Sequence, residues 1–112
     1  MCFKLILMLL AINTGLPAYI NANPIMGQIA SETQVDRITV ETDESPIYTV
    51  FYWDEEMQLW VRVLGQNGDK LGEFDMGKGN QITLSGTGKF TLEVFSLNGV
   101  GNWECECKNQ EE

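Results

Sequence analysis

Apolar residues recur at every second position over most of the chain after Val35, and this period is the feature that most restricts the fold. Side chains of a β-strand alternate between two faces, so the period indicates strands that bury one face each. No stretch shows the spacing of an amphipathic helix, and turn-forming segments rich in Gly, Asn and Asp separate the alternating segments. The pattern predicts seven strands, at Val35–Glu41, Ile47–Trp53, Met57–Leu64, Leu71–Asp75, Gln81–Leu84, Lys89–Leu97 and Trp103–Lys108.

Short strands separated by such turns predict a small all-β domain, either an antiparallel β-sandwich or a partly closed barrel. The clearest turn signal, Asn67-Gly68, suits a type I′ turn between the third and fourth strands, in a loop that Gln66 and Asp69 could lengthen. The predicted domain covers residues 35–108. A flexible lead-in at 23–34, which has no sustained period, precedes it, and a polar tail at 109–112 follows it.

Residues 1–22 have the pattern of a secretory signal peptide. Lys4 supplies a positive charge, Leu5–Ile12 is an unbroken apolar run, and a polar stretch ends in Ile20-Asn21-Ala22. We expect cleavage after Ala22, with Ala18 as the alternative site. The apolar run is shorter than the roughly 18 to 20 residues that span a bilayer. The sequence therefore predicts an exported protein, periplasmic or extracellular, with no stable membrane span after cleavage.

The composition excludes several classes of function. The chain has no histidine, which rules out nucleophile pairs and zinc sites that depend on imidazole. Its formal net charge of -9, from 7 Lys and Arg against 16 Asp and Glu, argues against a nucleic-acid partner, because phosphate binding relies on basic side chains. No catalytic constellation is present in the sequence, so we expect a protein that is not an enzyme.

A hairpin formed by the second and third strands about Glu55 would have one aromatic face. Its inner face would pair Phe51 with Leu59, Thr49 with Val61 and Ile47 with Val63. Its outer face would carry Tyr48, Tyr52, Trp60 and Arg62. Exposed aromatic rings beside an arginine can stack on a sugar ring or dock a peptide, so these four residues are the candidate ligand site. The alternative is that other parts of the protein cover them and that they serve packing.

Asp54, Glu55 and Glu56 would form the tip of this hairpin. Clustered carboxylates can ligate calcium, which makes these residues a candidate metal site, although the spacing of an EF-hand is absent. The alternative is that the carboxylates keep an exported β protein soluble and prevent pairing between sheet edges.

Cys105 and Cys107 lie two positions apart in the last predicted strand. Their side chains would point to the same face, roughly 6.6 Å apart, which is too far for a disulfide between them. In one interpretation they face inward with Trp103 as small apolar residues, while Glu104 and Glu106 face water. In the other they form intermolecular disulfides under the oxidising conditions of export.

Three C-terminal segments carry a family resemblance: Gln81–Leu84, Gly88–Phe95 and Gly99–Trp103. They resemble the end of bacterial pre-peptidase C-terminal domains. The resemblance implies a small exported β-sandwich of the kind that accompanies secreted enzymes and is thought to assist secretion or bind substrate. The acidic strand motif of that family would fall at Met57–Trp60, which contains no Asp, so no functional residue is carried over.

The sequence therefore predicts an exported, non-enzymatic β-sandwich that binds or scaffolds a carbohydrate or a protein. The alternative function is a thiol-dependent redox protein or a disulfide-linked envelope assembly that uses Cys105 and Cys107.

Overall fold

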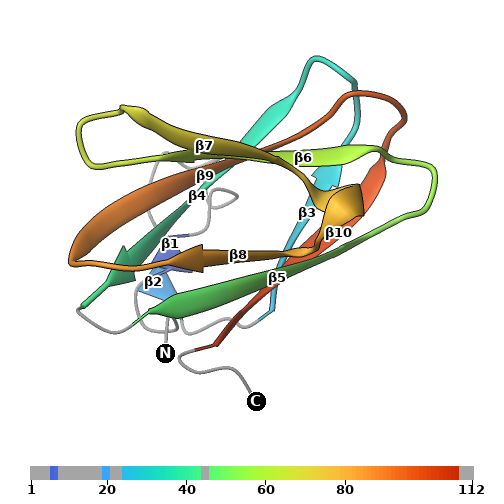
Figure 1. The fold of residues 1–112 in the computed structure, drawn as a ribbon. Coiled ribbons are helices and arrows are strands. Elements are labelled where there is room, and N and C mark those ends of the chain that lie inside the picture. Colours follow the sequence, from blue (N-terminus) through green and yellow to red (C-terminus); the bar gives the residue numbers. More distant parts are fainter. Residues whose placement is uncertain (1–5, 8–18, 21–23, 44–45, 109–112) are drawn as a thin grey trace.

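A computed structural model describes residues 6–7, 19–20, 24–43 and 46–108 (Figure 1). The predicted signal peptide lies outside the described residues except for two short strands, and the predicted tail at 109–112 lies outside them entirely. No helix in the described part of the chain is long and apolar enough to cross a membrane. The strands are β1 (Ile6–Leu7), β2 (Tyr19–Ile20), β3 (Ile25–Ile29), β4 (Val35–Thr42), β5 (Ile47–Trp53), β6 (Leu59–Leu64), β7 (Lys70–Asp75), β8 (Gln81–Leu84), β9 (Gly88–Ser96) and β10 (Gly101–Lys108), with a 3-10 turn, η3 (Met76–Lys78), after β7.

The strands form two antiparallel sheets packed face to face (Figure 1). We call the sheet with the order β2-β1-β4-β9-β6-β7 the β9 sheet, and the sheet with the order β3-β10-β5-β8 the β5 sheet. The predicted β-sandwich is confirmed. The partly closed barrel is wrong, because the two sheets keep separate edges, with β7 ending one sheet and β8 ending the other.

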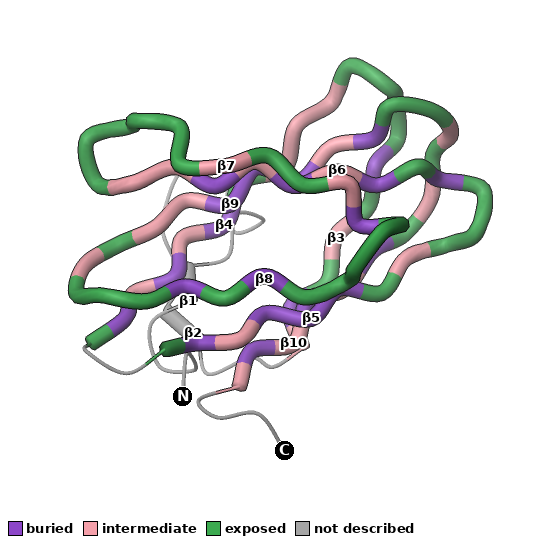
Figure 2. Tube along the Cα trace, in the orientation of Figure 1, coloured by how far each residue is buried: buried purple, intermediate pink, exposed green. Residues whose placement is uncertain are grey.

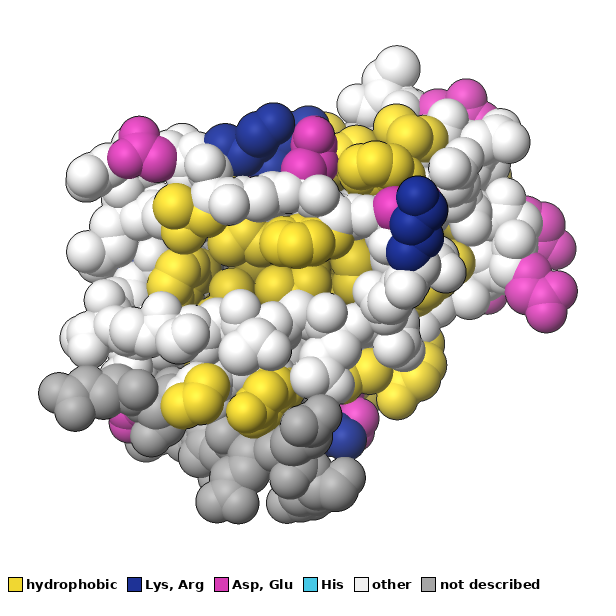
Figure 3. Space-filling view, in the orientation of Figure 1, with side chains coloured by type: hydrophobic (Ala, Val, Ile, Leu, Met, Phe, Trp, Pro, Cys, Tyr) yellow, Lys and Arg dark blue, Asp and Glu magenta, His cyan; other side chains and the backbone are white. Residues whose placement is uncertain are grey.

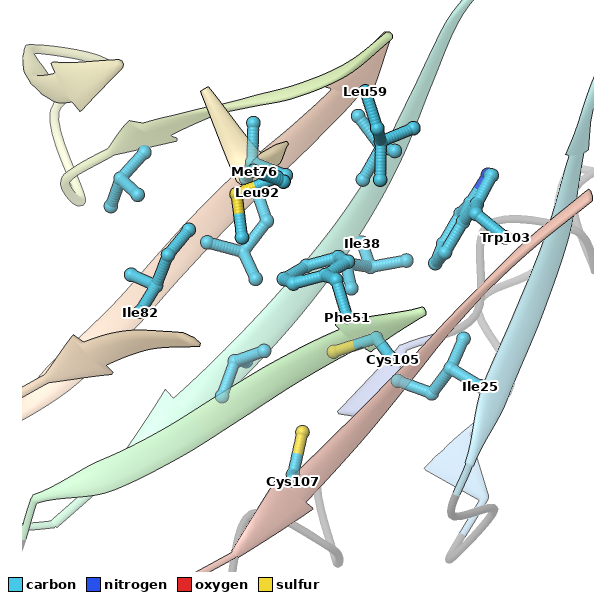
Figure 4. Packing of buried hydrophobic residues seen from close by; sticks show 14 of the residues in the cluster. Ile25, Ile38, Phe51, Leu59, Met76, Ile82, Leu92, Trp103, Cys105 and Cys107 are labelled. Carbon is cyan, nitrogen blue, oxygen red and sulfur yellow. The ribbon is translucent and has the colours of Figure 1, made fainter. Parts of the chain in front are cut away.

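The core lies between the sheets, where alternate residues of each strand point inward. Figure 2 shows this alternation, which in β6 and β10 is nearly continuous. Phe51 of β5 and Trp103 of β10 pack with their ring centroids 6.2 Å apart at an interplanar angle of 41°. Ile38, Leu59 and Leu92 of the β9 sheet reach the same interior (Figure 4).

All seven predicted strands are present, and the bounds of Ile47–Trp53 and Gln81–Leu84 are as predicted. The turn at Asn67-Gly68 takes its longer form. Gly68, at a φ of 83°, donates to the Gly65 carbonyl, and the Gly65 amide donates to the Asp69 carbonyl. This three-residue hairpin loop places its glycine in the left-handed region, where other residues are strained.

The prediction of a flexible lead-in is wrong for residues 25–29, which form β3 and pair with β10. Ile25 and Ile29 are buried, but the inward position between them is Gly27. The indole of Trp103 occupies the space that a side chain at Gly27 would fill. The alternation of β3 is therefore hidden in the sequence, because an aromatic ring from the neighbouring strand replaces the missing side chain.

The predicted hairpin between the second and third strands is also wrong. β5 pairs with β10 and β8, whereas β6 pairs with β9 and β7 in the opposite sheet. The connection at residues 54–58 crosses between the sheets, and the buried side chain of Met57 helps to close this end of the sandwich. The predicted inward faces are nevertheless correct: Ile47, Thr49, Phe51, Leu59, Val61 and Val63 are all buried.

Candidate functional site

The crossing connection separates the four residues of the predicted aromatic platform. Tyr48 and Tyr52 lie on the outer face of the β5 sheet, whereas Trp60 and Arg62 lie on the outer face of the β9 sheet. A single platform of these four side chains is therefore wrong. The two halves have different surroundings.

Arg62 belongs to a row of charged residues across the β9 sheet. Glu93 accepts from Arg62 Nη1 at 2.7 Å and from Arg37 Nε at 2.7 Å, and Glu73 accepts from Arg62 Nε at 3.0 Å. Lys70 lies 3.5 Å from Glu73 at the end of the row. We call Arg37, Glu93, Arg62, Glu73 and Lys70 the charge row.

The side chains of the charge row form ion pairs with one another. The Arg62 guanidinium also lies 4.7 Å from the centroid of the Phe95 ring, and its hydrogen bond to Glu93 raises its pKa. Burial alone would raise the pKa of Glu93, but the hydrogen bonds from Arg62 and Arg37 lower it below its usual value. Two of the N–H donors of Arg62 therefore bond to Glu73 and Glu93, which holds the guanidinium within the charge row.

Tyr52 lies at a cavity on the other face of the molecule. The cavity has a volume of about 370 Å³ and opens where β3, β5 and β10 meet. Its lining combines aromatic and apolar side chains with two carboxylates and an amide: Met26, Gly27, Tyr52, Trp53, Asp54, Asn102, Trp103 and Glu104. We call it the Tyr52 cleft.

Strand register places three of these residues in one row. Glu104 of β10 lies directly opposite Met26 of β3 on one side and Tyr52 of β5 on the other. Met26 is 59% exposed and Tyr52 is 49% exposed, while Glu104 is half-buried between them. Directly opposite side chains on one face lie close enough to interact. A ligand in the cleft can therefore contact the carboxylate and the neighbouring ring together.

The floor of the Tyr52 cleft is fixed by contacts between strands. Trp103 Nε1 donates to Asp36 Oδ2 of the β9 sheet at 2.9 Å, and its indole lies over Gly27. At the end of the cleft, Asp54 Oδ2 accepts from the backbone amide of Asn102 at 2.9 Å. These contacts hold the cleft open on rigid elements, as a preformed binding site requires.

The predicted metal site at Asp54, Glu55 and Glu56 is not assembled in this structure. Among residues 24–43 and 46–108, no three Asp, Glu, Cys or His side chains lie together in a way that could hold a metal ion. Asp54 instead accepts from the backbone amide of Asn102 near the start of β10, and Glu55 and Glu56 are exposed.

The two cysteines of β10 point into the core with Trp103, as one interpretation of the sequence predicts (Figure 4). Cys105 is a free thiol with no exposed surface, and burial raises its pKa. A neutral, inaccessible thiol is a poor nucleophile and a poor redox group. Cys107 is also buried and takes part in a disulfide bond. The intermolecular disulfide stays a prediction.

A second opening, which the sequence did not reveal, lies between the edge strands β7 and β8. It has a volume of about 220 Å³ and is lined mainly by apolar side chains. Figure 3 shows its apolar floor between the two strands. Leu71 and Phe74 stand exposed at its rim. The groove exists because each sheet ends at this side of the sandwich, which a strand pattern alone cannot indicate.

No protein family model matches the chain, and no curated protein matches it. Among solved structures, it is similar to the pre-peptidase C-terminal domain of a collagenase from Bacillus anthracis, with 19% identity and a TM-score of 0.61 over 77% of this chain and 89% of that one. It is also similar to the Yersinia pseudotuberculosis-derived mitogen, with 8% identity and a TM-score of 0.59 over 80% of this chain and 86% of that one. The predicted resemblance to pre-peptidase C-terminal domains is confirmed at the level of the fold.

Proposed function

We propose that this protein is an exported, non-enzymatic carbohydrate-binding module and that its sugar site is the Tyr52 cleft. The observation that carries the proposal is an open cavity of about 370 Å³ in which an exposed tyrosine lies beside Asp54, Asn102 and Glu104. Ligand sites typically combine apolar or aromatic walls with a few placed polar groups. A sugar ring can place its C–H face on the tyrosine, while the carboxylates and the amide accept and donate hydrogen bonds to its hydroxyls.

The position of the cleft supports this proposal. Seven of its eight lining residues come from three neighbouring strands, and Asp54 directly follows β5, so the site needs little ordering when a ligand binds. The N-terminal signal pattern supports export, where glycans are available as ligands. The buried state of Cys105 gives no support to a thiol-dependent function.

The test is the binding of soluble oligosaccharides to the exported protein and to Tyr52→Ala, measured by calorimetric titration. We expect Tyr52→Ala to weaken binding about tenfold or more, which corresponds to ~1.4 kcal/mol. The matched control is Tyr48→Ala, because Tyr48 lies on the same strand and the same outer face but does not line the cleft. Thermal unfolding of both variants checks that the fold is kept.

Two results would contradict the proposal. One is that no oligosaccharide binds the unmodified protein. The other is that Tyr48→Ala and Tyr52→Ala weaken binding equally, which would place the site outside the cleft.

A further inference from the structure

We infer that the Tyr52 cleft selects sugars that carry a protonated amine. This inference rests on the proposed carbohydrate binding and adds the chemical class of the sugar. Its basis is the imbalance of charge in the cleft: Asp54 and Glu104 line it, while no lysine or arginine among the described residues does.

Glu104 is the central observation. Across the residues that the structure describes, its carboxylate makes no ion pair and no hydrogen bond. Met26 and Tyr52 lie directly opposite Glu104 on the neighbouring strands, and neither offers it a counter-charge. A cation bound beside this unpaired carboxylate would form a charge-assisted hydrogen bond.

The neighbours of Glu104 favour a cation held on a flat ligand. The face of the Tyr52 ring attracts positive charge as well as C–H groups, so an ammonium group at Glu104 would also gain from the ring. Asn102, at the end of the cleft, has an amide that can both donate to and accept from hydroxyl groups. An amino sugar supplies the ring face, the hydroxyls and the ammonium group together.

The overall charge points the same way. A formal net charge of -9 attracts cationic ligands over long distances and speeds their association. Long-range attraction alone is not selective, however. The test must therefore separate the charge in the cleft from the charge elsewhere on the surface.

Three oligosaccharides of equal length and linkage provide that test. Chitosan, chitin and cellulose oligosaccharides carry an amine, an acetamide or a hydroxyl at the same ring carbon. We expect the exported protein, at mildly acidic pH, to bind the chitosan oligosaccharide about tenfold more tightly than the other two, as a charge-assisted hydrogen bond would give. Equal affinity for all three would overturn the inference and leave the proposed function standing. Binding of none would overturn both.

Two matched variants locate the charge that matters. Glu104→Gln keeps the shape of the side chain and should abolish the preference for the amine, and thermal unfolding of the variant checks that it is folded. Glu106→Gln removes the same charge from the same strand and face, two residues away and outside the cleft, and should keep the preference. If both variants reduce chitosan binding equally, the attraction is a property of the whole surface and the inference is wrong.

A lysine oligopeptide is the last probe, since it offers ammonium groups without sugar rings. We expect it to bind much more weakly than the chitosan oligosaccharide. Tighter binding of the peptide, together with no binding of any saccharide, would identify a basic protein segment as the ligand and overturn the assignment to sugars.

Discussion

The two outer faces of the sandwich each hold a glutamate at the centre of a row across the strands, with opposite surroundings. Glu93 of the β9 sheet lies between Arg37 and Arg62 and binds both. Glu104 of the β5 sheet lies between Met26 and Tyr52 and has no polar partner among the described residues. The same secondary structure thus gives one carboxylate that stabilises the fold and one that remains available to a ligand.

The difference indicates which face of the sandwich offers a group for ligand binding. A charged side chain that is paired within the protein has a structural role, because the pairing compensates the cost of burial. A charged side chain that has apolar neighbours and lies beside an open cavity has no such pairing, and it is a candidate for ligand binding.

Gly27→Val should destabilise the protein by about 3 kcal/mol, because overpacking in a filled core has this order of cost. The new side chain would overlap the indole of Trp103, which its hydrogen bond to Asp36 and its packing on Phe51 hold in place. Valine favours strands, so a loss of stability would reflect the overlap and not the backbone preference. Urea unfolding followed by tryptophan fluorescence measures the change.

The control for this substitution is Gly79→Ala. A Cβ at Gly79 meets no atom within 4 Å, and its φ of 173° is ordinary extended backbone. We expect a change within about 0.5 kcal/mol. If Gly27→Val were as stable as the control, the indole of Trp103 would be free to move. The claim that contacts between strands fix the floor of the Tyr52 cleft would then be wrong.

The same glycine shows why the sequence predicts the fold better than the site. Alternation is a local signal, so the inward positions of β5 and β6 are correct although the predicted pairing of those strands is wrong. The pairing depends on the connection at residues 54–58, which contains no glycine to define a hairpin turn. The sequence does not indicate β3 because Gly27 interrupts its alternation, and Trp103, which fills the gap, is distant in the sequence.

The candidate site depends on those distant pairings. Tyr52 is identifiable from its alternation and its aromatic ring, but its partners are not. Met26 lies in the strand that the sequence concealed, and Glu104 becomes a neighbour of Tyr52 only through the pairing of β10 with β5. The sequence pattern places Arg62 beside the tyrosines only through a hairpin between β5 and β6, and that hairpin does not form.

Glu93→Gln should destabilise the protein by about 1 to 2 kcal/mol, since two arginines lose a charged partner that is only 7% exposed. Glu104→Gln should change the free energy of unfolding by less than about 0.5 kcal/mol, because it breaks no contact. Urea titrations of both variants at neutral pH make the comparison. Equal destabilisation by the two would show that Glu104 has an internal role and would remove the distinction between the two rows.

Glu73→Gln refines the same experiment. Glu73 shares Arg62 with Glu93 but is more exposed, and contacts between exposed charges contribute little. We therefore expect a smaller loss than for Glu93→Gln. A larger loss of stability than for Glu93→Gln would mean that burial does not determine how much each glutamate of the charge row contributes to stability.

The smallest expected effect is a dependence of stability on pH that belongs to Glu93. The arginines lower the pKa of Glu93 in the folded protein below the 4.5 of an unperturbed glutamate, so the folded state takes up a proton later than the unfolded chain as the pH falls. The resulting stability is fully present above about pH 4.5 and is lost as the pH falls through the folded pKa. The effect is small because burial opposes the arginines. The difference in unfolding free energy between the unmodified protein and Glu93→Gln should therefore become smaller as the pH falls below about 4.5. A difference that stays constant would show that Glu93 stabilises the fold by its shape and not by its charge.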